Sequence, residues 1–254
     1  MQLAPPISVL IRCHNEADRI QRSLDAVTGL GREIVVIDSG STDGTIEIAQ
    51  AAGARVIQHA WDGFGPQRHF GEDQCVHDWI FYLDADEVPT PELRQEIREL
   101  FTQGEPAHAA YEIRNTMVLP GNIRPCLFAD FRMVTRLTNR RYARVSLEPS
   151  WDRVEVAAGR TTGILLGRQW HYSFRSWHHA ISKIDYTAGL AARTQLRKSR
   201  WLLRLRLITE YPMEFLKFYF VRRFVFAGWK GLCFSAIQAF SRLVRIKKML
   251  AIKH

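Results

Sequence analysis

The segment Trp79–Asp86 reads WIFYLDAD, an apolar and aromatic run that ends in two aspartates, Asp84 and Asp86. A continuous apolar run that stops abruptly at charge predicts a strand buried on both faces of a parallel sheet. Two carboxylates so close repel each other unless a cation lies between them. Hard oxygen ligands suit Mg²⁺ or Mn²⁺, which commonly hold substrate phosphates. The alternative is that Asp84, Asp86 and Glu87 cap a helix beginning near Pro91.

The first hundred residues contain three more segments with strand character, namely Ile7–Ile11, Glu33–Asp38 and Arg55–Gln58. Helical patterns lie between them, and alternating strands and helices predict a parallel sheet covered on both faces. In such sheets ligands bind beyond the carboxyl ends of the strands. We expect helices from Asn15, as N-cap, to about Gly29, from Ser41 or Thr42 to about Gly53, and from Pro91 to about Gln103.

Polar residues cluster at three of these strand ends. Glu16 follows the first strand, Asp38 ends the second, and the two aspartates follow the fourth. Their convergence on one sheet edge is the main indication of a binding site, and it favours the metal over the helix cap. Asp38 can accept hydrogen bonds from a nucleobase or ribose, or it can stabilise its own turn. Glu16 can contact a nucleotide, or interact with the positive end of its helix.

An aromatic and glycine-rich loop, Trp61–Gln67, precedes another predicted helix. Exposed amides at a helix start, with Arg68 beside them, can bind a diphosphate. Alone, the pattern favours a structural loop whose aromatic side chains fill the core. We interpret the basic run Arg132–Arg144 as a solvated face, with an acceptor-phosphate patch as the alternative. His171 has no zinc-like spacing to other ligands, which favours packing or an acceptor contact.

Charge is distributed unevenly along the 254 residues, whose net charge is +9. Residues 193–254 hold 15 Lys and Arg but two Glu, so they carry +13 and the rest of the chain carries −4. We expect a catalytic domain over residues 1–190 and a helical, basic region over 191–254 that meets an anionic surface. Nucleic acid is not the expected partner, because no recognisable binding motif accompanies the basic residues.

Further features predict a cytoplasmic protein that is peripheral on the inner face of the membrane. The four cysteines have no zinc-like or redox spacing, and no signal peptide is apparent. From about residue 200, aromatic and basic residues interleave as in an interfacial helix. The longest charge-free run, Gly231–Ser241, is far shorter than the ~20 residues of a spanning helix. An apolar stripe on the last helix either faces the bilayer or packs on the catalytic domain; it consists of Leu232, Ala236, Ala239, Leu243, Ile246 and Leu250.

Three segments, Ile7–Glu16, Ile34–Thr45 and Leu83–Glu87 with its Asp-x-Asp motif, occur in an order and spacing that resemble the family 2 inverting glycosyltransferases. The resemblance implies an α/β fold of the GT-A type, a Rossmann-like, mostly parallel mixed sheet with helices on both faces, here followed by the helical basic region. Most of the chain is similar to bacterial lipopolysaccharide core β-1,4-glucosyltransferases, through Trp61–Gln67, Arg136-Leu137, Arg153–Val156 and His171–Ser173.

This resemblance implies transfer of a hexose, with glucose expected, from a UDP-sugar to a glycolipid acceptor, the lipopolysaccharide inner core. Asp38 would contact uracil and ribose. Asp84 would lie against the nucleotide, and Asp86 would bind the Mg²⁺ or Mn²⁺ that clamps the diphosphate. Glu16 and Arg68 are further candidates for donor binding.

Inversion requires one general base, which takes the proton of the acceptor hydroxyl. The related proteins carry His-Glu just before the Arg-Val-Glu-Val segment, where this chain has Trp151-Asp152. Asp152 keeps a carboxylate and is our candidate for the base, with Glu148 as substitute; the alternative for Asp152 is a surface turn.

Two other functions stay open. The lost histidine allows an inactive carbohydrate- or membrane-binding relative. A sugar nucleotidyltransferase would share the sheet and the paired carboxylates. It would also need a glycine-rich, basic loop near the N-terminus, and Ser8–Glu16 contains no glycine.

Overall fold

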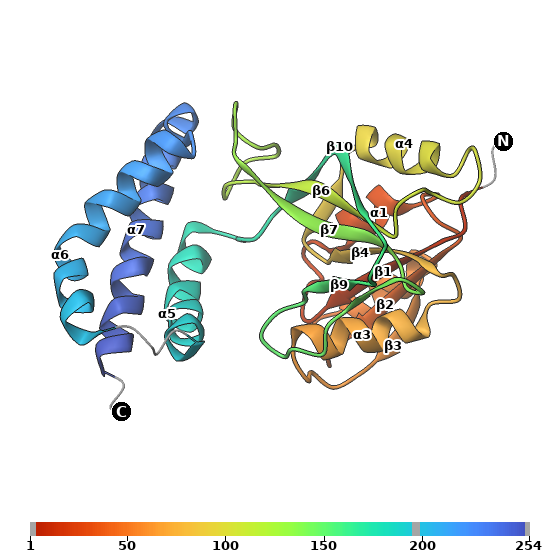
Figure 1. The fold of residues 1–254 in the computed structure, drawn as a ribbon, viewed down its shortest axis with the longest axis horizontal. Helices are drawn as coiled ribbons and strands as arrows, with labels where there is room; N and C mark the ends of the chain where they lie inside the picture. Colours follow the sequence, from red (N-terminus) through yellow and green to blue (C-terminus); the bar gives the residue numbers. More distant parts are fainter. Residues whose placement is uncertain (1–3, 195–198, 252–254) are drawn as a thin grey trace. The chain divides into compact units, whose positions relative to one another are not determined.

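The computed structural model describes residues 4–194 and 199–251. Its contacts divide the chain into two compact units, coloured along the sequence in Figure 1. The sheet unit consists of Met1–Thr116 and Phe131–His171, and the helical unit consists of Met117–Asp130 and Tyr172–His254. The domain boundary expected near residue 190 lies within helix α5 (Trp177–Thr194) and stays a prediction.

Four parallel strands form one half of an eight-stranded sheet: β1 (Ile7–Cys13), β2 (Glu33–Asp38), β3 (Arg55–Gln58) and β4 (Trp79–Asp84). β1 pairs in register with β4 so that Arg12 lies beside Asp84, and with β2 so that Cys13 lies beside Asp38. The carboxyl ends of these strands therefore meet at one edge, which confirms the expected parallel sheet. β3 has the bounds that its Val and Ile residues predict.

The other half of the sheet is antiparallel and contains β5 (Glu87–Pro89), β6 (Ala110–Met117), β7 (Phe131–Asn139) and β10 (Thr162–His171). The strand order is β3-β2-β1-β4-β7-β6-β10-β5. β6, β7 and β10 run for 8, 9 and 10 residues. A separate pair, β8 (Ala143–Val145) and β9 (Val154–Val156), flanks the loop that carries Glu148 and Asp152.

Helices cover both faces of the sheet (Figure 1). Alternate residues of β4 point to opposite faces, so Phe81 and Leu83 join one apolar core while Ile80 and Tyr82 join another. The larger core includes residues from α1 (Ile20–Val27), α2 (Thr45–Ala51) and α4 (Pro91–Leu100). On the other face, α3 (Phe64–Gln74) packs Phe70 on the smaller core. This two-sided burial explains the unbroken apolar run of β4.

The first helix begins later than the sequence predicts. α1 starts at Ile20, and Asn15 is in the left-handed region with φ 52°. The Asn15 amide donates to Ser41 Oγ at 2.8 Å, and the Glu16 amide donates to Thr45 Oγ1 at 2.8 Å. The segment after β1 is therefore a loop fixed against the start of α2, and Asn15 is not an N-cap.

The helical unit contains α5, α6 (Arg200–Leu216), a π-helical turn η1 (Lys217–Val221), a 3₁₀ turn η2 (Phe224–Ala227) and α7 (Gly228–Ala251). Leu203 of α6 packs with Ile246 and Met249 of α7. Among the described residues, none of the helices combines the length and apolar character that crossing a bilayer needs. The expected helical C-terminal region is confirmed.

Candidate active site

Asp84 ends β4 beside three side chains, of which Tyr82 and Arg136 are buried and Arg12 is partly buried. Arg12 of β1 donates from Nη2 to Asp84 Oδ1 at 2.5 Å, and the Tyr82 hydroxyl donates to the same oxygen at 2.8 Å. Arg136 of β7 approaches the other oxygen, with Nη2 3.4 Å from Oδ2. Burial would raise the pKa of Asp84, but Arg12 and Arg136 hold it well below its usual range. Asp84 is therefore a carboxylate at any physiological pH.

Arg136 joins several acidic groups into one network. Besides Asp84, its Nη2 donates to Glu87 Oε1 at 2.5 Å, and its Nη1 lies 3.9 Å from Asp152 Oδ2. Glu87 is fully buried, and burial raises its pKa despite the neighbouring guanidinium. We expected the basic run around Arg136 to be a solvated face. That expectation is wrong for Arg136, which is 7% exposed and part of the site.

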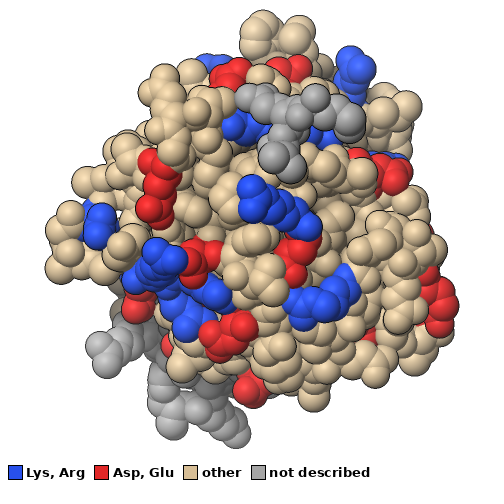
Figure 2. Space-filling view, turned by 90° about the vertical axis from the view of Figure 1, so that its right-hand side faces the viewer, with Lys and Arg blue, Asp and Glu red and all other residues tan. Residues whose placement is uncertain are grey.

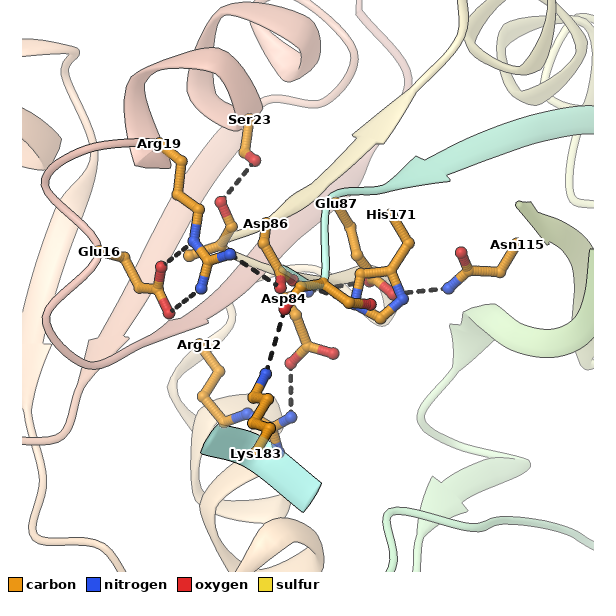
Figure 3. Close-up of polar contacts among 12 residues, drawn as sticks. Arg12, Glu16, Arg19, Ser23, Asp84, Asp86, Glu87, Asn115, His171 and Lys183 are labelled. Atoms are coloured by element: carbon orange, nitrogen blue, oxygen red, sulfur yellow. Dashed lines mark hydrogen bonds and ion pairs between the residues drawn. The ribbon is translucent and has the colours of Figure 1, made fainter. Parts of the chain in front are cut away.

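Asp86 faces a different set of partners, shown in Figure 3. His171, the last residue of β10, places Nε2 3.4 Å from Asp86 Oδ1, and Arg19 places Nη1 3.5 Å from Asp86 Oδ2. Burial lowers the pKa of His171, but the Asp86 carboxylate outweighs burial, so that pKa is raised. Pairing of β10 with β5 sets His171 opposite Glu87 and so delivers the imidazole to this edge.

The donor set at this edge suits a hard divalent ion. The strict arrangement of three or more His, Cys, Asp or Glu ligands is not found among the described residues. Mg²⁺ and similar ions, however, are usually held by one or two carboxylates together with substrate phosphates. Asp84 and Asp86 supply carboxylate oxygens, so these two residues fit such an ion held together with substrate phosphates.

Asp38 and Glu16 lie near this edge but are engaged locally. Asp38 is fully buried, and its Oδ1 accepts from the amides of Gly40 at 2.9 Å and Ser41 at 2.8 Å. Glu16 forms a two-point ion pair with Arg19, the same residue that approaches Asp86. The carboxylate of Asp38 thus orders the turn after β2. Its contact with a nucleotide, like that of Glu16, stays a prediction.

Arg68 lies inside the protein, on α3. It is 2% exposed, its Nε donates to Glu72 Oε1 at 3.2 Å, and its guanidinium carbon lies 4.3 Å from the centre of the Tyr82 ring. Arg12 and Arg136 contact the same ring at 5.6 and 4.9 Å. Arg68 therefore supports Tyr82, which in turn binds Asp84. A direct contact between Arg68 and a diphosphate stays a prediction.

The loop between β8 and β9 brings the two candidate bases to different places. Asp152 faces Arg136 and keeps a partly exposed side chain, 32% accessible. Glu148 is exposed, and its Oε1 accepts from the Ser150 amide at 3.3 Å within the loop. Of the two, Asp152 is the one that shares a partner with Asp84. The catalytic role of either carboxylate stays a prediction.

The glycine-rich segment before α3 supports this loop. The amides of Phe64 and Gly65 donate to the carbonyl oxygens of Pro149 at 2.9 Å and Glu148 at 3.3 Å. A Cβ on Gly65 would lie 2.2 Å from the Ser146 carbonyl oxygen, so only glycine allows the approach. Protein carbonyls therefore occupy these two helix-start amides, which we had considered for a diphosphate. The segment is a structural loop, which the pattern alone favoured, but Trp61 is 49% exposed and does not fill the core.

Gly65→Ala is expected to lower turnover at least tenfold while the protein stays folded. Alanine normally favours a helix over glycine by up to ~1 kcal/mol, but here its methyl group displaces the backbone that leads to Asp152. Gly71→Ala, on the same helix, is the control, because the nearest atoms to its Cβ are side-chain atoms of Leu10 and Ile37 in the core and not the backbone of the loop. Turnover and thermal melting of both variants test this, and equal turnover in the two would contradict it.

The mixed parallel and antiparallel sheet, with helices on both faces and two carboxylates at and just after the end of β4, is a fold of the GT-A type. A sequence model described as glycosyl transferase family 2 matches residues 8–165. The chain belongs to this family.

Relatives extend the match to the helical unit. An uncharacterised glycosyltransferase of Rickettsia prowazekii (strain Madrid E) is 34% identical over 96% of this chain and 86% of its own. The lipopolysaccharide core biosynthesis glycosyltransferase LpsC of Rhizobium meliloti (strain 1021) is 27% identical over 98% and 94%. Among solved structures, glucosyl-3-phosphoglycerate synthase from Mycobacterium tuberculosis, in complex with Mn²⁺, UDP and glucosyl-3-phosphoglycerate, is 27% identical, with a TM-score of 0.38 over 43% of this chain and 44% of its own.

Besides Arg136, the sequence interpretation missed two contributors to the site. Arg12 was not singled out, although its place one residue before the end of β1 puts it beside Asp84. His171 was assigned to packing or acceptor contact, and its position beside Asp86 depends on the β10–β5 pairing. Both residues lie at or next to the end of a strand, and this position could have identified them. The sequence interpretation considered only the acidic residues at such positions.

Proposed function

We propose that the protein transfers a hexose, with glucose as the expected sugar, from a UDP-sugar to a glycolipid acceptor of the lipopolysaccharide core, with inversion at the anomeric carbon. The observation that carries the proposal is the network at the edge of the sheet, where Arg12 and Arg136 bind Asp84 and Arg136 also faces Asp152. Membership of the family and the similarity to LpsC support the reaction and the class of acceptor.

Asp86 and Asp84, with His171 beside them, would hold Mg²⁺ or Mn²⁺. When bound, such an ion neutralises charge that develops on the leaving diphosphate. The protein's own part is to keep both carboxylates ionised in a buried setting. Arg12 and Arg136 do this for Asp84, while His171 holds the pKa of Asp86 below its usual value against the effect of burial.

Donor binding is proposed for the residues around the ends of β1, β2 and β4. Asp38 would contact the uracil and ribose, and Asp84 would lie against the nucleotide. Glu16 would act from the loop after β1, where it holds Arg19 near Asp86. Arg68 would act through Tyr82, since its guanidinium stacks on the ring whose hydroxyl binds Asp84.

Asp152 is proposed as the general base that removes the proton of the acceptor hydroxyl as this oxygen attacks the anomeric carbon. Its partly exposed carboxylate lies next to Arg136, which also contacts Asp84. The same buried guanidinium would therefore position both the base and the donor site. The 3.9 Å separation from Arg136 leaves the carboxylate oxygens available to accept a proton. Glu148 is the substitute, on the exposed part of the same loop.

A glycolipid acceptor implies work at a membrane surface. We propose that the protein is peripheral on the inner face of the cytoplasmic membrane, held there by its helical unit. The interleaved aromatic and basic residues from about residue 200 onward support this location.

The proposed reaction is tested by incubating the purified chain with UDP-glucose, Mn²⁺ and a lipopolysaccharide inner-core acceptor, and measuring both released UDP and sugar incorporated into the acceptor. Equal amounts of the two are expected. Release of pyrophosphate from UTP and a sugar phosphate would instead identify a nucleotidyltransferase. No turnover of any UDP-sugar would identify an inactive binding protein.

A further inference from the structure

Most of the large apolar side chains that the structure leaves exposed belong to the helical unit. Two groups stand out, one in the loop between β6 and β7 and one around η1 and η2. In the loop, Ile123 is 83% exposed and Leu127 is 67% exposed. The other group consists of Phe220, Val221, Phe226 and Trp229, each more than half exposed. Single exposed apolar residues need no explanation, but clusters of them mark interaction surfaces.

The two groups form one surface, although about a hundred residues separate them in sequence. The Phe128 ring meets the Phe226 ring edge-on, with centroids 5.1 Å apart. Lys230 Nζ donates to Asn122 Oδ1 at 2.5 Å and to the Gly121 carbonyl at 3.3 Å. We call the surface formed by residues 121–128 and 220–230 the loop–turn surface.

The loop–turn surface lies on well-packed residues. Beneath it, Leu119 of the loop packs with the buried rings of Phe224 and Phe234. Arg222 Nη1 forms an ion pair with Asp130 Oδ2 at 3.2 Å, which fixes the other end of the loop to the turns. The exposed side chains are therefore presented by an ordered scaffold, and their exposure is not the result of a loose segment.

Phe128 adopts an uncommon backbone conformation at this exposed place. Its φ is 57°, in the left-handed region that a large side chain other than glycine rarely occupies. Such a conformation costs free energy, and residues that keep it are concentrated at functional positions. A strained phenylalanine that is 56% exposed gains little from packing in the free protein, which favours a contact made with a partner.

The charge of the surface points to an anionic partner. The charged residues of the loop–turn surface are Arg124, Arg222, Arg223 and Lys230, all of them basic. The acidic residue next to this surface, Asp130, is paired with Arg222. On the face of the molecule shown in Figure 2, by contrast, acidic and basic side chains are interspersed. Aromatic rings among basic groups are typical of the headgroup boundary of a bilayer.

The apolar stripe of the last helix is only partly covered. Ala239 and Ile246 of α7 are buried, and Leu250 packs against the Leu203 cluster between α6 and α7, whereas Leu232 is 46% exposed. The C-terminal part of the stripe is thus used inside the helical unit. Exposed apolar side chains on α6, such as Ile208, and those of the loop–turn surface remain for a membrane contact.

We propose that the loop–turn surface is where the protein docks on an anionic bilayer, with Ile123, Leu127 and Phe128 entering the headgroup boundary. The proposal refines the peripheral location in the proposed function and rests on it. It assigns to the β6–β7 loop a role that the sequence pattern reserved for the C-terminal helices. Attraction to anionic lipid adds about 1 kcal/mol for each basic residue near the surface and is screened by salt.

The test is flotation of the full chain with vesicles of phosphatidylcholine and phosphatidylglycerol in equal amounts. The triple variant Ile123→Ser, Leu127→Ser, Phe128→Ser is expected to bind at least about tenfold more weakly, because binding scales with buried apolar area. The control variant Val76→Ser, Ile164→Ser, Leu166→Ser removes three comparably exposed apolar side chains from the sheet unit and is expected to float like the natural chain.

A second variant, Arg124→Gln with Arg223→Gln, keeps every apolar side chain and is expected to weaken flotation at low salt but not at high salt. Unchanged flotation of the triple variant, or equal loss in the control, overturns the proposal. The proposal is also overturned if the natural chain does not bind vesicles and light scattering shows that it self-associates through this surface. Turnover of UDP-glucose, measured on the same proteins, separates failure of the docking proposal from failure of the proposed reaction. A variant that keeps turnover but no longer floats has lost docking alone. Absence of turnover in the natural chain would count against the proposed reaction.

Discussion

Asp86→Ala is expected to remove nearly all turnover, a loss of at least about 10²–10³-fold, since stabilising charge on a leaving group typically contributes several kcal/mol. The substitution removes the carboxylate that lies against His171 and Arg19. Excess chelator is expected to inactivate the natural chain to a similar extent, and Mn²⁺ or Mg²⁺ is expected to restore it. Turnover with and without chelator measures both effects.

Asp78→Ala is the matched control for this prediction. Asp78 immediately precedes β4, at the opposite end of the strand from Asp86, and is ion-paired with Arg140 and Arg141. Asp78→Ala also removes two ion pairs, but Asp78 lies away from the site, so this variant is expected to keep its turnover. Full activity of the natural chain in excess chelator would show that no divalent ion takes part.

Asp152→Asn is expected to reduce turnover by about 10²–10⁴-fold with little change in the affinity for UDP. The amide keeps the shape of the side chain and its place beside Arg136 but no longer accepts a proton. Rates under saturating donor and isothermal titration with UDP separate the two quantities. A base acts in the chemical step, so the loss is expected in kcat.

Glu148→Gln is the comparison that assigns the base, because Glu148 lies on the same loop but is exposed and accepts a hydrogen bond from the Ser150 amide. It is expected to retain most activity. The reverse pattern, with Glu148→Gln inactive and Asp152→Asn active, would move the catalytic role to Glu148.

The parallel half of the sheet could be predicted from sequence because each strand there is an unbroken apolar run between polar ends. β4, buried on both faces, is the clearest case. The helix after β1 was placed too early. The residues that look like its cap, Asn15 and Glu16, hydrogen-bond instead to Ser41 and Thr45, more than twenty residues away. Local pattern cannot show such a tertiary preference.

The acidic residues of the site could be predicted in the same way, since strand ends can be read from the sequence. The basic residues of the site could not be predicted from the sequence. Arg136 resembles its exposed neighbours in sequence, and only the pairing of β7 with β4 turns it toward Asp84. His171 depends likewise on β10 reaching β5. Long-range antiparallel pairing sets these positions, and its register leaves little trace in local periodicity.

The apolar stripe of α7 illustrates a further limit. Its three- and four-residue spacing predicts an apolar helix face but says nothing about what covers that face. The structure covers the C-terminal part of this face with α6 and leaves Leu232 exposed. Exposure of residues on the β6–β7 loop has no periodic signal at all, so the loop–turn surface emerges only when the two distant segments are seen together.

The most direct test of the account is transfer of radiolabelled glucose from UDP-glucose to a lipopolysaccharide inner-core acceptor by the natural chain, Asp86→Ala and Asp78→Ala, each with Mn²⁺. The account predicts one UDP released for each glucose incorporated by the natural chain and by Asp78→Ala, and almost no incorporation by Asp86→Ala. Equal incorporation by all three proteins, or none by the natural chain with any UDP-sugar, would contradict it.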